Sequence, residues 1–365
     1  MESFLNNIKK MDWGLNALAV LMSLIGIIGI YSASFFEQDF LDFKKQIIFL
    51  IIGFCLMIIL SFFDWKIFRS DSYLILALYI LSILSLVLVL FIGPNIQGVR
   101  SWYRIGPISI DPIEPMKLIL IILLAKYFSM RHVEMYKIIH ILISGIYVLL
   151  PCFFIALQPD LGSAFILILL WIGILIISGI EIKHFLILLF CAILVFGFSW
   201  NHFLKEYQKQ RVLSFITPNL EPLGAGWSLL QSKIAIGSGG FKGTGLKQGS
   251  QTQLGFITAE KTDFIFAVIA EEFGFFGVSF LLFIISVFFW KVINIAFITR
   301  NNFEKLFCLG YVVLFSSQIF VNIGMNLGIL PVIGISLPFV SYGGSSLITN
   351  FIGLSILQNT IISKP

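Results

Sequence analysis

An acidic residue at the start of an apolar run is the first candidate for chemistry in this sequence. Asp263 opens the stretch TDFIFAVIAEE, and helical spacing places Ala267, Ala270 and Glu271 on the same face. The small alanines predict a groove beside the carboxylate, where a general base would meet a substrate hydroxyl. The alternative is that Thr262 caps the helix and Asp263 is an ordinary acid of its first turn, stabilised by the helix dipole.

An acid and a lysine three residues apart form the second candidate. In IEPMK, Glu114 and Lys117 share a helix face. Ionisable residues at membrane depth are candidates for function, so the lysine would face a lipid phosphate while the glutamate orients it. The alternative is an ion pair that only neutralises itself. Just upstream, Arg100, Trp102 and Arg104 are candidate receivers of an anion.

Two further segments carry candidates for substrate binding. Asp160 lies in QPDLG, an irregular joint between two apolar runs, where substrate binding and a helix N-cap both remain open. Lys233 lies in the segment 228–236, which we expect to form an amphipathic helix on the membrane surface. The glycines after it follow no strand and end in no GK[ST], so a nucleotide site is not predicted.

The composition assigns these residues to an all-α membrane protein. Of 365 residues, 58% are hydrophobic and 12% charged, and 39 are phenylalanine, which suits lipid-facing helices better than alternating barrel strands. We expect one polytopic membrane domain, residues 1–365, with a long loop at about 201–263. Runs long enough to cross a bilayer lie near 14–33, 46–63, 73–93, 113–129, 138–157, 161–180, 184–200, 264–290, 306–329 and 344–362.

The distribution of basic residues predicts the orientation. With a cytoplasmic N-terminus, twelve of the 24 Lys and Arg lie in inner segments, five in short outer loops and seven in the long loop. Both termini are then cytoplasmic, and the polar motifs lie on the outer face. The formal charge of +5 is scattered, so nucleic-acid binding is not expected, and the four histidines have no metal-ligand spacing. No built-in cofactor is predicted.

The order of the motifs indicates a family. GVRSW precedes PxxExxKL and QPDLG, followed by QSKIAIGSGG, KGxGxxxGxQxQLxF, TDFIFAVxAEExGxxG and VNIGMxxGxLPVxGxxLPxxSYGGSS. Over nearly its whole length the sequence resembles the SEDS family (shape, elongation, division and sporulation) of bacterial cell-wall polymerases. IAIGSGG, AVIAEE and LPVIG are more similar to the RodA branch, which serves elongation, than to the FtsW branch, which serves division.

The resemblance implies a ten-span peptidoglycan glycosyltransferase in the bacterial cytoplasmic membrane. Such an enzyme polymerises lipid II at the outer face, alongside a class B penicillin-binding protein. The family's essential aspartate falls on Asp263, and the acid and lysine of PxxExxK fall on Glu114 and Lys117. The family's QPSE reads DPIE here, with Asp111 first, and a histidine before the aspartate is replaced by Lys261.

The chemistry of polymerisation needs a base for a sugar hydroxyl and cations for a lipid diphosphate. A divalent cation would share the diphosphate charge, although no ligand cluster in the sequence demands one, so the metal is left unknown. Two other functions use similar residues: a transporter that flips lipid II, and a scaffold that positions a penicillin-binding protein. Transporters usually show two related halves, and no internal repeat is found here.

Overall fold

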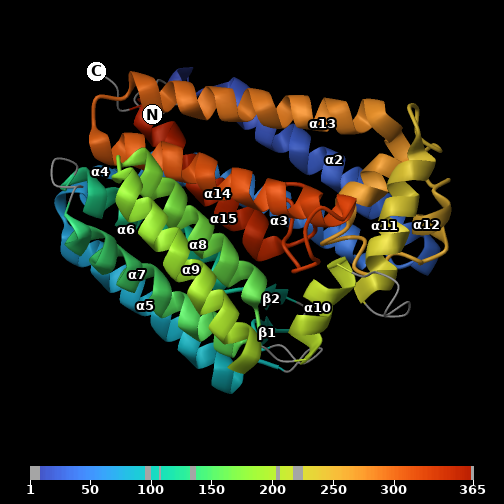
Figure 1. Ribbon diagram of the computed structural model, residues 1–365. Helices are drawn as coiled ribbons and strands as arrows, with labels where there is room; N and C mark the ends of the chain where they lie inside the picture. Colours follow the sequence, from blue (N-terminus) through green and yellow to red (C-terminus); the bar gives the residue numbers. More distant parts are fainter. Residues whose placement is uncertain are drawn as a thin grey trace.

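The protein is built almost entirely from helices, as its composition predicts (Figure 1). The computed structural model describes residues 9–94, 100–106, 108–131, 137–202, 206–216 and 225–362, so the loop 201–263 and the GVRSW motif are described only in part. Among these residues the strands form one antiparallel hairpin, β1 (Tyr103–Ile105) and β2 (Ile108–Ile110).

The helices follow one another in chain order. The first half contains α2 (Trp13–Glu37), α3 (Leu41–Ser61), α4 (Lys66–Ser70), α5 (Ser72–Ile92), α6 (Ile113–Ser129), α7 (Ile138–Leu157) and α8 (Leu161–Ile177). The second half contains α9 (Ile182–His202), α10 (Glu206–Ile216), α11 (Ala225–Gly239), α12 (Ser250–Gln253), α13 (Ile265–Ile298), α14 (Asn302–Leu327) and α15 (Gly344–Ile362).

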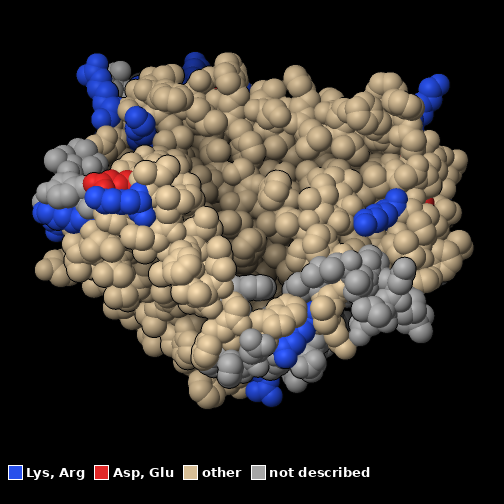
Figure 2. Space-filling view, in the orientation of Figure 1, with Lys and Arg blue, Asp and Glu red and all other residues tan. Residues whose placement is uncertain are grey.

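Every predicted apolar run coincides with one of these helices. Seven of them, α2, α3, α5, α7, α13, α14 and α15, are long and apolar enough to cross a membrane, and α8 and the first part of α9 are shorter apolar helices. The remaining run is α6, with 17 residues. Figure 2 shows a broad middle band without acidic or basic side chains, as a lipid-facing surface requires. The protein is therefore a polytopic helical membrane protein.

Helix α6 lies at the centre of the bundle. It packs against α5, α7, α8, α14 and α15, and twelve of its 17 residues are buried. An apolar helix surrounded by other helices is buried on all sides. Consequently Glu114 and Lys117, in the first turns of α6, are carried into the interior of the protein.

The two chain ends lie at the same end of the bundle, together with α4 (Figure 1). The helices of the long loop, α10, α11 and α12, lie toward the opposite end. The segment that joins α12 to α13 contains Asp263, and the start of α13 lies at the end away from the termini. The termini and the start of α13 therefore lie at opposite ends of the bundle.

Helix α11 has the predicted helical conformation but not the predicted position. It packs against α13 and α14, where the fully buried Ser232 donates a hydrogen bond to the main-chain oxygen of Asn326 at 2.9 Å. Leu230 and Ile234 are exposed. The prediction of a helix resting on the membrane surface is wrong, because the polar side chain of Ser232 finds its partner inside the bundle, whereas Leu230 and Ile234 face outward.

The groove predicted along Asp263, Ala267 and Ala270 is also wrong. Ala267 and Ala270 are buried, and a side-chain carbon at Gly239 of α11 would lie 2.0 Å from the main-chain oxygen of Ala270. Small residues on facing helices let the two backbones approach closely. The alanines and glycines therefore serve close packing of α11 on α13, which leaves no groove.

The two glutamates of AVIAEE anchor the end of the long loop. The carboxylate of Glu271 accepts hydrogen bonds from the main-chain nitrogens of Gln251 (2.7 Å) and Thr252 (3.0 Å) and from the Thr252 hydroxyl (2.7 Å). Glu272 accepts from the Ser32 hydroxyl and from the main-chain nitrogen of Lys247. These acids stabilise the fold, which explains their presence in an apolar helix.

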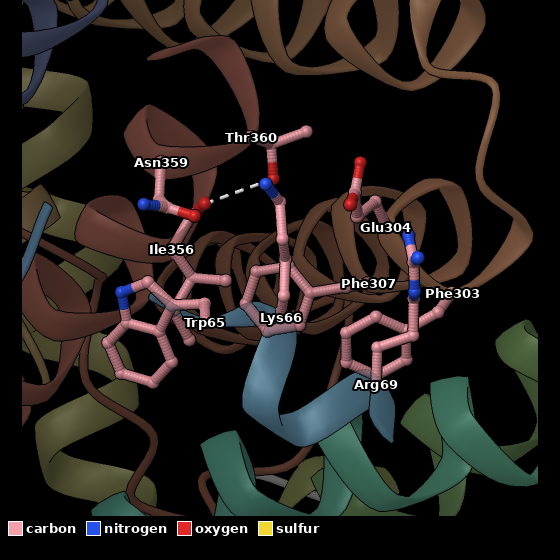
Figure 3. Close-up of a pocket in the computed structure, with 9 residues that line it drawn as sticks. All are labelled: Trp65, Lys66, Arg69, Phe303, Glu304, Phe307, Ile356, Asn359 and Thr360. Atoms are coloured by element: carbon pink, nitrogen blue, oxygen red, sulfur yellow. Dashed lines mark hydrogen bonds between the residues drawn. The ribbon is translucent and has the colours of Figure 1, made fainter. Parts of the chain in front are cut away.

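A small pocket opens at the end of the bundle that carries the termini (Figure 3). Its lining comes from α4 with the residue before it, from the start of α14 and from the end of α15, and Thr360 donates a hydrogen bond to the main-chain oxygen of Ile356 at 3.0 Å. The lining residues are Trp65, Lys66, Arg69, Phe303, Glu304, Phe307, Ile356, Asn359 and Thr360. This pocket contains none of the candidate residues and lies at the opposite end from Asp263.

Candidate active site

Asp263 lies in a turn just before α13. The helix begins at Ile265, and the capping position, Phe264, makes no side-chain cap. The hydroxyl of Thr262 donates to the main-chain oxygen of Ala259 at 3.2 Å. Thr262 therefore does not cap the helix, and Asp263 is not an acid of its first turn. The alternative interpretation, in which the helix dipole explains this aspartate, is wrong.

Two buried asparagines of α14 hold the main chain of Asp263. The side-chain nitrogens of Asn322 and Asn326 each lie 3.0 Å from the main-chain oxygen of Asp263. Asn322 also donates to the main-chain oxygen of Ile335 at 2.7 Å, and Asn326 accepts from the main-chain nitrogen of Ala267 at 3.3 Å. The position of Asp263 is therefore fixed by a neighbouring helix, rather than by its own segment alone.

The loop between α14 and α15, residues 328–343, covers the carboxylate. Gly334 has a φ of 74°, a conformation that favours glycine, and a side-chain carbon there would lie 3.4 Å from Oδ2 of Asp263. The hydroxyl of Ser341 donates to the main-chain oxygen of Thr262 at 2.6 Å. The motif LPVIGISLPFVSYGG thus packs against the turn that carries the acid.

The surroundings of Asp263 suit a base. Burial raises the pKa of its carboxyl to about 6, an effect that the cation of Arg211 on α10 opposes and the carboxylate of Asp160 reinforces. A carboxylate with a pKa of about 6 is ionised at pH 7 and is more basic than an ordinary aspartate. Arg211 belongs to the long loop and was not among the residues predicted from the sequence.

Glu114 and Lys117 form an ion pair. Nζ of Lys117 lies 2.8 Å from Oε1 of Glu114, and both residues are buried. The pairing considered from their spacing is present. The pairing is compatible with a role of Lys117 in binding a lipid phosphate, because this lysine also interacts electrostatically with Asp111 and Asp160.

Asp111 joins this group from the segment before α6. Its Oδ1 accepts a hydrogen bond from the main-chain nitrogen of Ile113 at 2.9 Å, and its own main-chain nitrogen donates to the hydroxyl of Ser345 at 2.9 Å. Burial and the nearby Glu114 raise the pKa of Asp111 to about 8, against the effect of Lys117. The sequence indicated Asp111 only as a departure from the family pattern.

Asp160 links the two halves of the site. Its carboxylate accepts from the main-chain nitrogen of Ser163 at 3.0 Å, so it is the N-cap of α8, as one of the two alternatives predicted. It also interacts electrostatically with Asp263, Asp111 and Lys117. The fold therefore brings segments near residues 111–117, 160 and 263 into one charged region.

Three other candidates have different surroundings. Arg100 is exposed and donates to the main-chain oxygen of Leu90 at 3.4 Å, near the end of α5. Trp102 is half-buried beside Gly93. Lys233 crosses the end of α14, where a side-chain carbon at Gly328 would lie 2.0 Å from its Cε. A cation is favourable at the carboxyl end of a helix, so Lys233 has a structural explanation there.

Lys261, which stands where the family pattern has histidine, is turned toward α3. Its Nζ lies 3.7 Å from Oδ2 of Asp42, and its main-chain oxygen accepts from the main-chain nitrogen of Tyr342 at 2.9 Å. Lys261 thereby ties the turn before Asp263 to the start of α3 and to the SYGG motif.

The arrangement combines one basic carboxylate with a buried lysine and an arginine from the long loop. Figure 2 shows a hollow in the centre of the face between α9 and α10, the helix that carries Arg211. Within the described residues no group of three or more His, Cys, Asp and Glu side chains has the arrangement of a metal site. Proton abstraction next to a bound anion is the chemistry that these side chains can perform.

The signal that sequence reasoning missed is the pair of asparagines inside α14. Asn322 and Asn326 are four residues apart in a mostly apolar span, so they share a helix face. Polar residues inside a membrane span mark functional sites by default. That rule would have identified both asparagines, but it would not have shown that they bind the main-chain oxygen of Asp263.

Comparison with known protein families gives one match over almost the whole chain. The family model described as cell cycle protein, which covers FtsW, RodA and SpoVE, matches residues 12–364. Among curated relatives, stage V sporulation protein E of Bacillus subtilis is 34% identical over 349 residues, 94% of either chain. The peptidoglycan glycosyltransferase MrdB of Escherichia coli is 33% identical over 344 residues, which cover 94% of this chain and 91% of that one.

Solved structures give the same result. One chain from a study of the structural coordination of polymerization and crosslinking by a peptidoglycan synthase complex is 30% identical, with a TM-score of 0.83 over 96% of this chain and 97% of that one. The crystal structure of the rod shape determining protein RodA of Thermus thermophilus is 28% identical, with a TM-score of 0.71 over 96% of both chains.

Proposed function

Because this chain belongs to the FtsW, RodA and SpoVE family of cell cycle proteins, we propose that it is a peptidoglycan glycosyltransferase of cell elongation with Asp263 as its general base. It polymerises lipid II into glycan strands. One observation supports the assignment of the base. The turn that carries Asp263 is held by hydrogen bonds from two asparagines of α14, and its carboxylate lies beside Gly334 and interacts electrostatically with Arg211.

The proposed reaction uses one proton transfer and one substitution. Asp263 takes the proton of a sugar hydroxyl on the acceptor, and that oxygen attacks the anomeric carbon of the donor sugar. The bond between this carbon and the diphosphate oxygen breaks, and the lipid diphosphate leaves with the bonding electrons. Arg211 and Lys117 stabilise the negative charge of the leaving group, and Glu114 orients Lys117.

We place this site at the outer face of the bacterial cytoplasmic membrane, in a protein of ten spans. The excess of basic residues in the short loops on the side of the termini supports this orientation, since such loops stay in the cytoplasm. The start of α13, just after Asp263, lies toward the other end of the bundle (Figure 1). Membrane lipid surrounds the charge-free band seen in Figure 2.

A class B penicillin-binding protein is the proposed partner. One structural relative comes from a peptidoglycan synthase complex that couples polymerization and crosslinking, which supports a partner that crosslinks. We also propose that four further residues contact the substrate: Arg100, Trp102, Asp160 and Lys233. A divalent cation that shares the diphosphate charge is compatible with the reaction, and adding a chelator to the assay tests it.

The test uses purified protein, its partner and labelled lipid II. The wild type is expected to form glycan polymer, and Asp263→Ala, along with the isosteric Asp263→Asn, should lose about 10²- to 10⁴-fold of the rate, the usual contribution of a general base. Lipid II flipping by the wild type without polymer would instead identify a transporter. Polymer that depends on the partner's activity alone, with no effect of Asp263→Ala, would identify a scaffold.

A further inference from the structure

The carbonyl of Asp263 is taken out of the hydrogen bonding of α13. In a regular helix the main-chain nitrogen of Ala267 would donate to Asp263, but here it donates to Phe264 at 3.0 Å. The tightened first turn leaves the Asp263 oxygen for the side chains of Asn322 and Asn326, both fully buried. We propose that these two asparagines are positioning residues for the glycosyl transfer, an inference that rests on the proposed function.

Asn322 connects the base to the loop that covers it. Its side-chain nitrogen has two hydrogens, one directed to the Asp263 oxygen at 3.0 Å and the other to the Ile335 oxygen at 2.7 Å. Ile335 follows Gly334, whose backbone lies against the Asp263 carboxylate. One amide thus sets the spacing between the acid and the loop that lies against its carboxylate.

Asn326 connects the base to α13 and to the long loop. Its nitrogen donates to the oxygens of Asp263 (3.0 Å) and Asn322 (2.8 Å), while its Oδ1 accepts from the nitrogen of Ala267. Its own main-chain oxygen accepts from the hydroxyl of Ser232 on α11. A displacement of α11 is therefore transmitted to the turn that holds Asp263.

The two asparagines fix the position of Asp263 and do not contribute to the affinity for the substrate. Both amides contact the main-chain oxygen of Asp263 and not its carboxylate. Misplacing a catalytic group by about 1 Å can lower a rate by about 10², without a matching loss of substrate binding. The proposal therefore predicts a fall in kcat at nearly constant KM.

The experiment measures kcat and KM for labelled lipid II with the full-length protein and its partner. Asn322→Ala combined with Asn326→Ala is expected to lower kcat by about 10², with KM changed by less than about threefold. Asn326→Asp alone keeps the size of the side chain and the acceptor for Ala267, but replaces the donor, so it is also expected to lower kcat by about tenfold or more. This second variant decides the outcome if the double variant does not fold.

Asn350→Ala provides a matched control. Asn350 is a buried asparagine of α15 whose side-chain nitrogen has no hydrogen-bond partner among the described residues. Its removal should leave kcat within about twofold of the wild type. The proposal is overturned if folded Asn326→Asp matches this control, or if the loss lies in KM. Failure of the wild type itself to form polymer would overturn the proposed function instead.

Discussion

Nζ of Lys117 lies 2.8 Å from Oε1 of Glu114 in the interior of the helix bundle. Taking both charges out of water is costly, and the pair is tolerated because each group compensates the other. Asp160 adds further negative charge near the lysine, and Asp111 does so once it ionises. The pair is therefore a structural unit, and its lysine is also a buried cation close to these acids; substitutions can separate the two roles.

Removing one partner of this pair should destabilise the protein, whereas removing both should not. Glu114→Ala leaves a buried ammonium group and is expected to cost about 3–5 kcal/mol of unfolding free energy. Glu114→Met with Lys117→Met should restore most of this stability, because both charges are gone, yet should leave polymerisation inactive. Thermal unfolding in detergent and glycan formation measure the two effects. An active double variant would restrict the pair to a structural role.

The rate of polymerisation should have an acidic limb set by Asp263. The base acts in its ionised form, and burial raises its pKa to about 6, so the rate should fall by about tenfold for each pH unit below that value. Initial rates between pH 4.5 and 7.5, at lipid II concentrations well below KM, measure this limb, because kcat/KM reports the pKa values of the free enzyme. Asp263→Asn should keep only a low rate that lacks it. A wild-type rate that stays constant down to pH 5 would contradict the assignment.

The same profile should have an alkaline limb set by Asp111. Its pKa of about 8 leaves this carboxyl protonated at pH 7, and ionisation above pH 8 adds negative charge beside Glu114, Asp160 and Lys117, where a diphosphate is expected. Asp111→Asn keeps the acceptor for the nitrogen of Ile113 but cannot ionise. It should retain activity at pH 7 and lose the decline above pH 8. An unchanged decline would assign that limb to another group.

Glu271 should control how firmly the long loop is attached. In Glu271→Gln an NH₂ group replaces one of the two oxygens that accept from Gln251 and Thr252, and each lost hydrogen bond to a charged group costs about 1–3 kcal/mol. Hydrogen exchange at the Gln251 and Thr252 amides should accelerate by about tenfold or more. Glu181→Gln, at a half-buried glutamate that pairs with Lys183 away from the long loop, is the control and should leave this exchange unchanged.

Much of the fold could be predicted because it depends on composition and span length. A bilayer requires apolar helices of about 20 residues, and each predicted run coincides with a helix, including α6 and α9. The family could be predicted from motif order, and the match over residues 12–364 confirms it. The position of α11 was predicted wrongly, because hydrophobic periodicity does not tell whether a polar face meets water or another helix.

The sequence by itself determined the class of protein and its family, since apolar length and motif spacing are properties of the linear chain, and it also predicted the acid at residue 263. Only the tertiary structure decided which distant groups surround that acid. The two amides on its carbonyl come from α14, about 60 residues later, and the cation that opposes the rise in its pKa comes from α10. Groups so distant in the sequence are brought together by the packing of the helices, and this packing depends on the shapes of all facing surfaces together.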